Sequence, residues 1–360
     1  MQLKLLEILA CPQCRGDLSC VSRESGEDGG VREGELGCAP CRKVYPVEDG
    51  IPRFVPRENY ASSFGYQWNR FKLEQIDSAN GTNLSEKRFY SETGWSAEGL
   101  GGKWVLDAGC GAGRFLDVAS RSGAEVVGLD ISDAVDAARA NLAGRGNAHL
   151  VQGSILSPPF KAGAFDACYC IGVIQHTPDP RAALRALPVL LREGGRIAVT
   201  IYERKPWTKL NAKYLVRPLT KRLGKERLLR GIRGAMPVLF PLTDVLFRLP
   251  VVGRVFVFSI PVANYVGEKS LSRRQRYDWA VLDTFDMLSP QYDQPQTQDE
   301  VQAALAEAGV VDIERLPNPG VNVVGRKEGG RPAAAGVRPG VPAAAPALSG
   351  ATSPAERGSN

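Results

Sequence analysis

The sequence predicts an α/β fold in which a mostly parallel sheet is joined to a small cysteine-rich module. Two observations predict it. Residues 101–203 alternate short apolar segments with helical segments, a pattern typical of a parallel sheet with crossover helices. Residues 1–57 contain two C-x-x-C pairs, a spacing that suits a metal site. The chain has 360 residues, of which 43% are hydrophobic, and this is enough for both parts.

The two pairs of the N-terminal module are Cys11 with Cys14 and Cys38 with Cys41. Four thiolates on two tight turns suit a tetrahedral structural zinc ion. The polar, glycine-rich stretch 25–35 between the pairs is typical of a hairpin tip. Unpaired thiols or a disulfide are the alternative, which a reducing compartment disfavours. A module of this size has little core, so bound zinc would supply much of its stability.

Apolar segments flank the two pairs, at residues 5–9 (LLEIL) and 45–52 (YPVEDGIP). With these segments, residues 1–57 resemble the small zinc-binding activator subunit of certain tRNA and protein methyltransferases. The resemblance implies a zinc-ribbon module, fused here to the rest of the chain, that supports a catalytic domain and does not itself catalyse a reaction.

Residues 58–100 form an aromatic-rich connecting segment. Its first part contains Phe64, Tyr66, Trp68 and Phe71. These side chains either pack the two modules together or line a cofactor or substrate pocket, and the sequence leaves both interpretations open.

The core at residues 101–203 is expected to contain five strands, at 104–108, 125–130, 149–152, 164–173 and 196–202. Helices are expected between them at 114–122, 133–143 and 181–191. In a sheet of this type the ligand binds at the carboxyl ends of the strands.

The first strand leads into a glycine turn, VLDAGCGAGR at residues 105–114. Gly109, Gly111 and Gly113 permit a sharp turn and leave room for a ligand beside the backbone. Asp130 ends the second strand, where a carboxylate can accept hydrogen bonds from both hydroxyls of a ribose. The glycines alone would also fit a structural turn, but the acid at the end of the next strand favours a nucleoside-like ligand.

This strand, the turn D-x-G-C-G-x-G and the following acid resemble the signature of class I S-adenosylmethionine-dependent methyltransferases of type 11. The resemblance implies a Rossmann-like sheet, parallel with an antiparallel closing strand, and S-adenosylmethionine as cofactor. The cofactor-binding residues that it implies are Asp107, Gly109, Gly111, Gly113, Asp130, Ile131, Ser154 and Ile155. The family usually has an acid that binds the adenine amino group at the position of Ser154, so this chain departs from the pattern there.

His176 follows the fourth strand, just before Asp179 and Pro180, which predict the start of a helix. The resemblance places this loop beside the methyl donor and the acceptor, so His176 is a candidate general base. A contact with the acceptor or a role in orienting the loop is the alternative. The segment SPPF at 157–160 mimics a motif of enzymes that methylate bases, but it precedes the fourth strand and is interpreted as a turn.

Residues 204–296 interrupt the path from the fifth strand to the last two. Between residues 203 and 280 there are 17 Lys and Arg against five Asp and Glu. Apolar residues recur at helical spacing over 207–225 and 227–247, and 251–266 is apolar. We expect a lid over the carboxyl edge of the sheet. It either encloses an anionic or lipid-linked acceptor, or lies on an anionic membrane surface, or is a helical subdomain with a solvated basic face.

Three residues at the end of this insertion are acceptor-site candidates, because residues 283–292 resemble a segment of methyltransferases of small molecules and of polysaccharide or lipid precursors. They are Asp283, Asp286 and Tyr292. Residues 297–327 are expected to hold a capped helix at 299–308 and closing antiparallel strands at 310–316 and 320–326. Residues 328–360 are rich in Gly, Pro and Ala, and we expect a disordered tail.

The favoured function is methyl transfer to an oxygen or nitrogen of a small molecule, a sugar or a lipid-linked, anionic precursor. An RNA methyltransferase is the second reading, but residues 1–50 lack the basic charge that nucleic acid would require. A non-catalytic protein-binding module is the third, and the glycine turn with Asp130 argues against it. We expect a cytoplasmic location, with peripheral membrane contact as an option, because residues 1–10 do not read as a signal peptide and Arg254 and Pro261 interrupt the longest apolar stretch.

Overall fold

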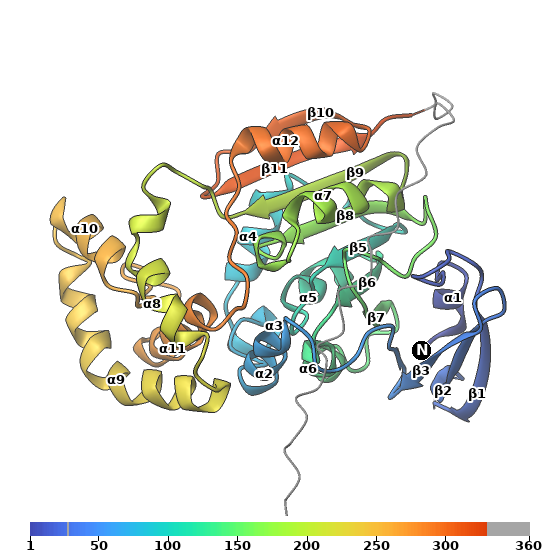
Figure 1. Ribbon diagram of the computed structural model, residues 1–360, viewed down its shortest axis with the longest axis horizontal. Coiled ribbons are helices and arrows are strands. Elements are labelled where there is room, and N and C mark those ends of the chain that lie inside the picture. The colour runs from blue at the N-terminus through green and yellow to red at the C-terminus, as the bar shows by residue number, and fades with distance from the viewer. Residues whose placement is uncertain (27–28, 330–360) are drawn as a thin grey trace, which may run out of the picture. The chain divides into compact units, whose positions relative to one another are not determined.

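A seven-stranded sheet forms the centre of the protein in a computed structural model that describes residues 1–26 and 29–329 (Figure 1). In sheet order the strands are β10 (Val310–Arg315), β11 (Val321–Lys327), β9 (Leu191–Ile201), β8 (Phe165–Ile171), β5 (Trp104–Ala108), β6 (Glu125–Asp130) and β7 (Ala148–Gln152). Neighbouring strands from β9 to β7 are parallel, whereas β11 is antiparallel to β9 and β10 to β11. The predicted fold class is confirmed. The expected tail lies, from residue 330 on, outside the described residues.

The helices that accompany this sheet are α2 (Ser62–Arg70), α3 (Asp77–Asn80), α4 (Leu84–Thr93), α5 (Arg114–Ser120), α6 (Ala134–Asn141), α7 (Pro180–Ala186) and α12 (Gln298–Glu307). Of these, α5, α6, α7 and α12 lie close to predicted positions, whereas α2, α3 and α4 lie in the connecting segment, for which no helix positions were predicted. The Asp179 carboxylate accepts a hydrogen bond from the Ala182 N–H at 2.9 Å and caps α7. Thr297 and Glu300 form the predicted capping box of α12.

The helix predicted at 181–191 is too long. α7 ends at Ala186, and Pro188 opens a short 3₁₀ turn, η2 (Pro188–Leu190), because proline lacks the N–H that an α-helix would use there. The strand that follows therefore begins at Leu191 and not at residue 196.

The insertion consists of η3 (Thr208–Leu210), α8 (Ala212–Thr220), α9 (Lys225–Leu246), α10 (Val252–Ser259) and α11 (Arg273–Leu288). α11 was not predicted, and the apolar stretch 251–266 is helical only over α10. Figure 1 shows α9 and α10 farther from the sheet than α11. Within the described residues, none of the helices combines the length and apolar character needed to cross a bilayer.

The sheet has a hydrophobic core on each face, because successive residues of a strand point to opposite sides. On one face, Leu106 and Ala108 of β5 share a buried cluster with Leu5 and Leu9 of the N-terminal module. On the other, Val105 packs in a second cluster with helices α4 and α5. The module is thus part of the core of the larger domain.

The N-terminal module, called here the cysteine module (residues 1–57), contains α1 (Leu3–Leu6) and a four-stranded antiparallel sheet of β1 (Ser19–Ser25), β2 (Val31–Cys38), β3 (Lys43–Glu48) and β4 (Ile51–Pro52). The segment 157–160 is the turn that we expected, and it docks this module. The Ala10 N–H donates to the Pro159 carbonyl at 3.0 Å, and the Ser157 hydroxyl donates to the Pro12 carbonyl at 2.8 Å.

Candidate functional site

The turn after β5 requires glycine at three positions. Gly109, Gly111 and Gly113 have φ angles of 95°, 53° and 86°, a region that other residues disfavour. A Cβ atom on Gly109 would overlap the side chain of Val173. One on Gly111 would lie 3.1 Å from the indole nitrogen of Trp68. Close packing from the loop after β8 and from α2 therefore excludes larger residues here.

Asp130, at the end of β6, fixes this turn. Its Oδ2 accepts a hydrogen bond from the Gly111 N–H at 2.9 Å. Its Oδ1 accepts from the N–H and the hydroxyl of Ser132, at 2.8 and 2.7 Å. Burial raises the pKa of Asp130, and these hydrogen bonds oppose the rise. The carboxylate is held rigidly in the wall of the site, and Oδ2, which accepts one of these three hydrogen bonds, can accept a further one.

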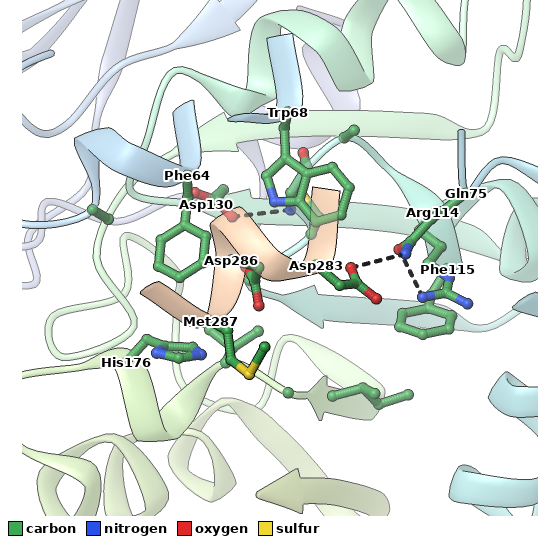
Figure 2. Close-up of a pocket in the computed structure, with 18 of the residues that line it drawn as sticks. Phe64, Trp68, Gln75, Arg114, Phe115, Asp130, His176, Asp283, Asp286 and Met287 are labelled. Atoms are coloured by element: carbon green, nitrogen blue, oxygen red, sulfur yellow. Dashed lines mark hydrogen bonds between the residues drawn. The ribbon is translucent and has the colours of Figure 1, made fainter. Parts of the chain in front are cut away.

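A cavity of about 540 Å³ opens beside this turn, a volume that suits a small-molecule ligand (Figure 2). The ends of β6 and β8 and the glycine turn border it, with Phe64 and Trp68 of α2 on one side and α11 over it. In the part of the chain that the structure describes, no residue of α8, α9 or α10 lines the cavity. Of the predicted lid at 204–296, the part that covers the site is therefore α11 with the loop before it, whereas α8, α9 and α10 lie outside the lining of the cavity.

Most of the predicted cofactor residues meet at this cavity. Those that line it are Gly109, Gly111, Asp130, Ile131 and Ile155.

Three predicted cofactor residues do not line the cavity. Asp107 is 2% exposed and lies below the surface beside Tyr169, and burial raises the pKa of both groups. Gly113 ends the turn and begins α5. The Ser154 hydroxyl accepts a hydrogen bond from the Leu156 N–H at 3.2 Å. Asp107, Gly113 and Ser154 therefore lie behind the walls of the cavity and support them.

His176 lines the cavity from the loop after β8 and is 6% exposed. Its Nδ1 lies 2.9 Å from the backbone carbonyl of Tyr292. Because a carbonyl only accepts, Nδ1 carries the proton and Nε2 keeps its lone pair. Nε2 is buried and has no hydrogen-bond partner among the described residues. Burial lowers the pKa of His176, although Asp286 opposes this, so the ring is neutral at pH 7.

Two carboxyl groups of α11, Asp283 and Asp286, also line the cavity (Figure 2). Asp283 accepts a hydrogen bond from Gln75 at 3.4 Å, and Asp286 accepts one from Gln67 at 3.3 Å. Burial raises the pKa of both, and repulsion from Asp286 adds to the effect on Asp283, whose pKa rises to about 7. The Gln75 side chain is oriented by Arg114, which donates to its Oε1 at 2.8 Å.

Two of the three acceptor candidates, Asp283 and Asp286, are thus placed in the cavity. The third, Tyr292, contributes the carbonyl that holds His176. Sequence reasoning missed Arg114 and Trp279, which both line the cavity. Arg114 could have been identified from its position directly after the glycine turn. Trp279 had no such signal, because the helix that carries it was not predicted.

The four predicted metal ligands also come together. The Sγ atoms of Cys11, Cys14, Cys38 and Cys41 all lie within 4.8 Å of one another, as the vertices of a tetrahedral thiolate site would. Burial opposes ionisation of Cys11, but hydrogen bonds from the Tyr45 hydroxyl and from backbone N–H groups outweigh it and lower its pKa to about 6. The donor set therefore fits one metal ion.

The sequence matches two known families. Residues 106–199 match the model of a family described as a methyltransferase domain. Residues 2–50 match the model of a family described as Trm112p-like protein. Both resemblances inferred from the motifs are confirmed, and they fall on the glycine-turn domain and on the cysteine module.

Curated relatives include proteins named ubiquinone biosynthesis O-methyltransferase. The protein from Acinetobacter baumannii is 31% identical over 140 residues, which cover 35% of this chain and 56% of the relative. The one from Cronobacter sakazakii is 34% identical over 132 residues, covering 35% and 54%. The chain thus spans about half the length of these relatives.

Among solved structures, a complex between the Haloferax volcanii Trm112 methyltransferase activator and a putative methyltransferase is similar over 74% of this chain and 99% of that chain, at 13% identity and a TM-score of 0.41.

Proposed function

We propose that this protein is an S-adenosylmethionine-dependent methyltransferase that acts on an oxygen or nitrogen of a small molecule, a sugar or a lipid-linked precursor. The observation that carries the proposal is the buried, unpartnered Nε2 of His176, a residue that lines the same cavity as Gly109, Gly111 and Asp130. One side of the cavity suits a nucleoside cofactor. The other offers a group that can take a proton from the acceptor.

The residues present fit S-adenosylmethionine. The close-packed glycine turn leaves backbone at the cavity wall for the amino-acid end of the cofactor. Asp130 suits the ribose hydroxyls, and Ile131 and Ile155 offer apolar surface to the adenine ring. The bound cofactor supplies a methyl group on a positively charged sulfur.

His176 is the proposed general base. The hydrogen bond from Nδ1 to the Tyr292 carbonyl fixes the ring, and Nε2 takes the proton that the acceptor loses. Asp286 favours the charged imidazolium that results. The aromatic walls and α11 hold the acceptor and exclude water, and this positioning contributes a large part of the rate.

An oxygen acceptor on an apolar ring or chain is the proposal that the lining supports best. Seven aromatic side chains line the cavity: Tyr60, Phe64, Trp68, Phe115, Tyr202, Tyr265 and Trp279. The relatives that are named O-methyltransferases favour oxygen. We favour this class over RNA, because α11 covers the cavity, and over a non-catalytic binding module, because such a module has no need of the unpartnered base.

We propose that the cysteine cluster binds structural zinc. Four cysteines complete the coordination of a tetrahedral ion and leave no position for a substrate, so the metal stabilises the module.

A cytoplasmic location with peripheral membrane contact remains our proposal for this chain. Exposed apolar residues on α9 and α10 support the contact: Val238, Leu242, Val245, Val252, Val255 and Val257.

The proposed function is tested in two steps. Calorimetry measures the binding of S-adenosylhomocysteine, the demethylated cofactor, to the full chain. Methyl groups carrying tritium are then followed from S-adenosylmethionine into cell extracts separated into lipid, small-molecule and RNA fractions. We expect binding, and label in the lipid or small-molecule fraction. A chain that binds neither form of the cofactor would overturn the proposal, and label in RNA would reassign the acceptor.

A further inference from the structure

A second cavity, of about 1160 Å³, lies on the other side of α2. One wall is formed by residues at and before α2, and the other by the α8–α9 turn and the first turns of α9, which Figure 1 shows beside each other. We call it the basic cavity. It is lined by one carboxylate, Glu226, and by the cations Lys221, Arg222, Lys225, Arg227 and Arg230.

These five cations differ from the structural cations nearby. On α8, Lys213 pairs with Asp293 at 2.9 Å, and Arg217 donates to the carbonyls of Met287 and Pro290 at 3.0 and 2.8 Å. Within the described residues, by contrast, none of the cations of the basic cavity forms an ion pair. Five cations beside a single carboxylate raise the local potential and attract an anion.

Ser63 of α2 gives an independent indication of a ligand. It lines the basic cavity and is 6% exposed, and its buried hydroxyl has no hydrogen-bond partner among the described residues. The Ser289 hydroxyl, on the same cavity, is also buried without a partner. An unsatisfied buried hydroxyl is costly, and a ligand oxygen would satisfy it.

The start of α9 adds a third feature. This helix is 22 residues long, and its N-cap, Gly224, provides no side chain to accept hydrogen bonds from the first turn. The free N–H groups and the helix dipole favour an anion at this end. Gly224 and Lys225 both line the basic cavity.

The geometry points to the basic cavity as a binding site for a phosphate or diphosphate group. Such a group offers several acceptor oxygens, which match the forked donors of Arg227 and Arg230 and the hydroxyl of Ser63. The features above support the binding of such a group in the basic cavity. The further step, that the group is part of the methyl acceptor, rests on the proposed function.

The two cavities are linked by α2 and the residues before it. Phe64 and Trp68 line the first cavity, whereas Ser62 and Tyr66, on the opposite face of the helix, line the basic cavity. Tyr60 lines both. An acceptor that reaches past Tyr60 would place its phosphate in the basic cavity and the atom to be methylated near His176.

The site is tested by calorimetry of the full chain with inorganic pyrophosphate at low salt. We expect binding, an affinity at least tenfold lower in Arg227→Ala and Arg230→Ala, and a several-fold loss in Ser63→Ala. Arg273→Ala is the matched control, because Arg273 is an exposed arginine in the first turn of α11 outside both cavities, and it should bind like the wild type. No binding, or equal affinity in Arg227→Ala and Arg273→Ala, would overturn the site.

A second arm distinguishes a free phosphate from a lipid headgroup. Flotation compares vesicles of phosphatidylglycerol with vesicles of phosphatidylcholine. Flotation with phosphatidylglycerol that Arg227→Ala abolishes supports the site and identifies a lipid as the source. If Arg227→Ala still floats with these vesicles and the wild type does not bind pyrophosphate, the membrane contact is made by the apolar helices. That result would overturn the site. Binding of S-adenosylhomocysteine is measured separately, so failure of the methyltransferase proposal is recognised independently.

Discussion

Arg53 and Gln152 are joined across the junction between the cysteine module and the sheet, where Arg53 Nη1 donates to Gln152 Oε1 at 2.8 Å. Gln152 in turn donates to the Asp133 carboxylate at 3.1 Å and to the Ile131 carbonyl at 3.4 Å. Arg53 also pairs with Asp136 at 2.7 Å and is 6% exposed. The module is therefore linked through Gln152 to the loop that lines the cofactor cavity.

Replacing Arg53 by alanine leaves Asp136 and Gln152 without their partner in this junction. We expect the free energy of unfolding, measured by urea denaturation, to fall by about 3 kcal/mol. Arg57 is the control, since it is exposed and pairs with Glu48 at 2.6 Å. Arg57→Ala should change the free energy of unfolding by less than about 1 kcal/mol. Equal losses in the two variants would contradict a structural role for Arg53.

The Asp130→Asn variant removes the charge that we assign to the cofactor ribose. Because hydrogen bonds to a charged group contribute about 1.5–3 kcal/mol, the affinity for S-adenosylhomocysteine should fall about 10- to 100-fold. Asp166 is a matched control, because it also accepts a backbone N–H, that of Trp104 at 2.8 Å, but lies outside the cavity. If Asp166→Asn weakened binding as much, Asp130 would have no specific role.

Two substitutions at His176 separate catalysis from support of the loop. The His176→Asn amide can replace Nδ1 as donor to the Tyr292 carbonyl but cannot act as a base. We expect methyl transfer to slow by roughly 100- to 10,000-fold, with cofactor affinity and stability retained. His176→Ala should lose both the base and the support of the loop.

The rate of the wild type should fall as the pH drops through the lowered pKa of His176, where Nε2 becomes protonated. His176→Asn should lack this acid limb. A variant that keeps the wild-type rate and pH profile would show that His176 only orients the loop.

Asp283 makes stability depend on pH. Its pKa is about 7 in the folded protein, against roughly 3.9 in an unfolded chain. The folded state therefore holds more protons between these values, and its stability falls as the pH rises through this range. Asp283→Asn should flatten the dependence and raise the unfolding free energy at pH 8 by roughly 1–3 kcal/mol.

The matched control is Asp278→Asn, on the same helix, where the carboxylate pairs with Arg274 at 2.9 Å near the surface. Urea titrations at pH 5 and pH 8 measure both variants. Asp278→Asn should keep the pH dependence of the wild type. If the unfolding free energy of Asp283→Asn changed between these pH values as much as that of the wild type does, Asp283 would ionise normally.

The cysteine module should depend on its metal. Cys11→Ser should lose bound zinc, measured by mass spectrometry of the metal, and should lower Tm by roughly 5–10 °C, as should a chelator. Cys20 is the control, because it lies on β1 outside the cluster. Cys20→Ser should keep the metal and the Tm. A zinc-free chain that melts at the wild-type temperature would contradict the structural role.

Much of this fold and site could be predicted because local chemistry determines it. Positive φ angles and close packing require the glycines of the turn, and the strand that ends at Asp130 follows from its apolar residues. The spacing of the paired cysteines predicts the metal site. These features depend on residues that are close together in the sequence.

The rest depends on contacts between distant segments. The hydrogen bond between His176 and the carbonyl of residue 292 joins residues 116 positions apart in the chain and has no sequence signature. Trp279 lies on α11, whose apolar residues face both the cavity and the insertion's own core, so its helical face was obscured. The turn at 157–160 looked unrelated to the cysteine module, and only the fold shows that it docks that module.

The covalent link between the cysteine module and the sheet has a consequence for how the two parts stay together. Partners on one chain meet at an effective concentration in the millimolar range, whatever the dilution of the protein. The shared core and the hydrogen bonds at Arg53 and at the 157–160 turn therefore need not supply the free energy of bringing two molecules together. A contact too weak to hold a separate subunit would suffice here, and the ratio of cysteine module to sheet domain is always one to one.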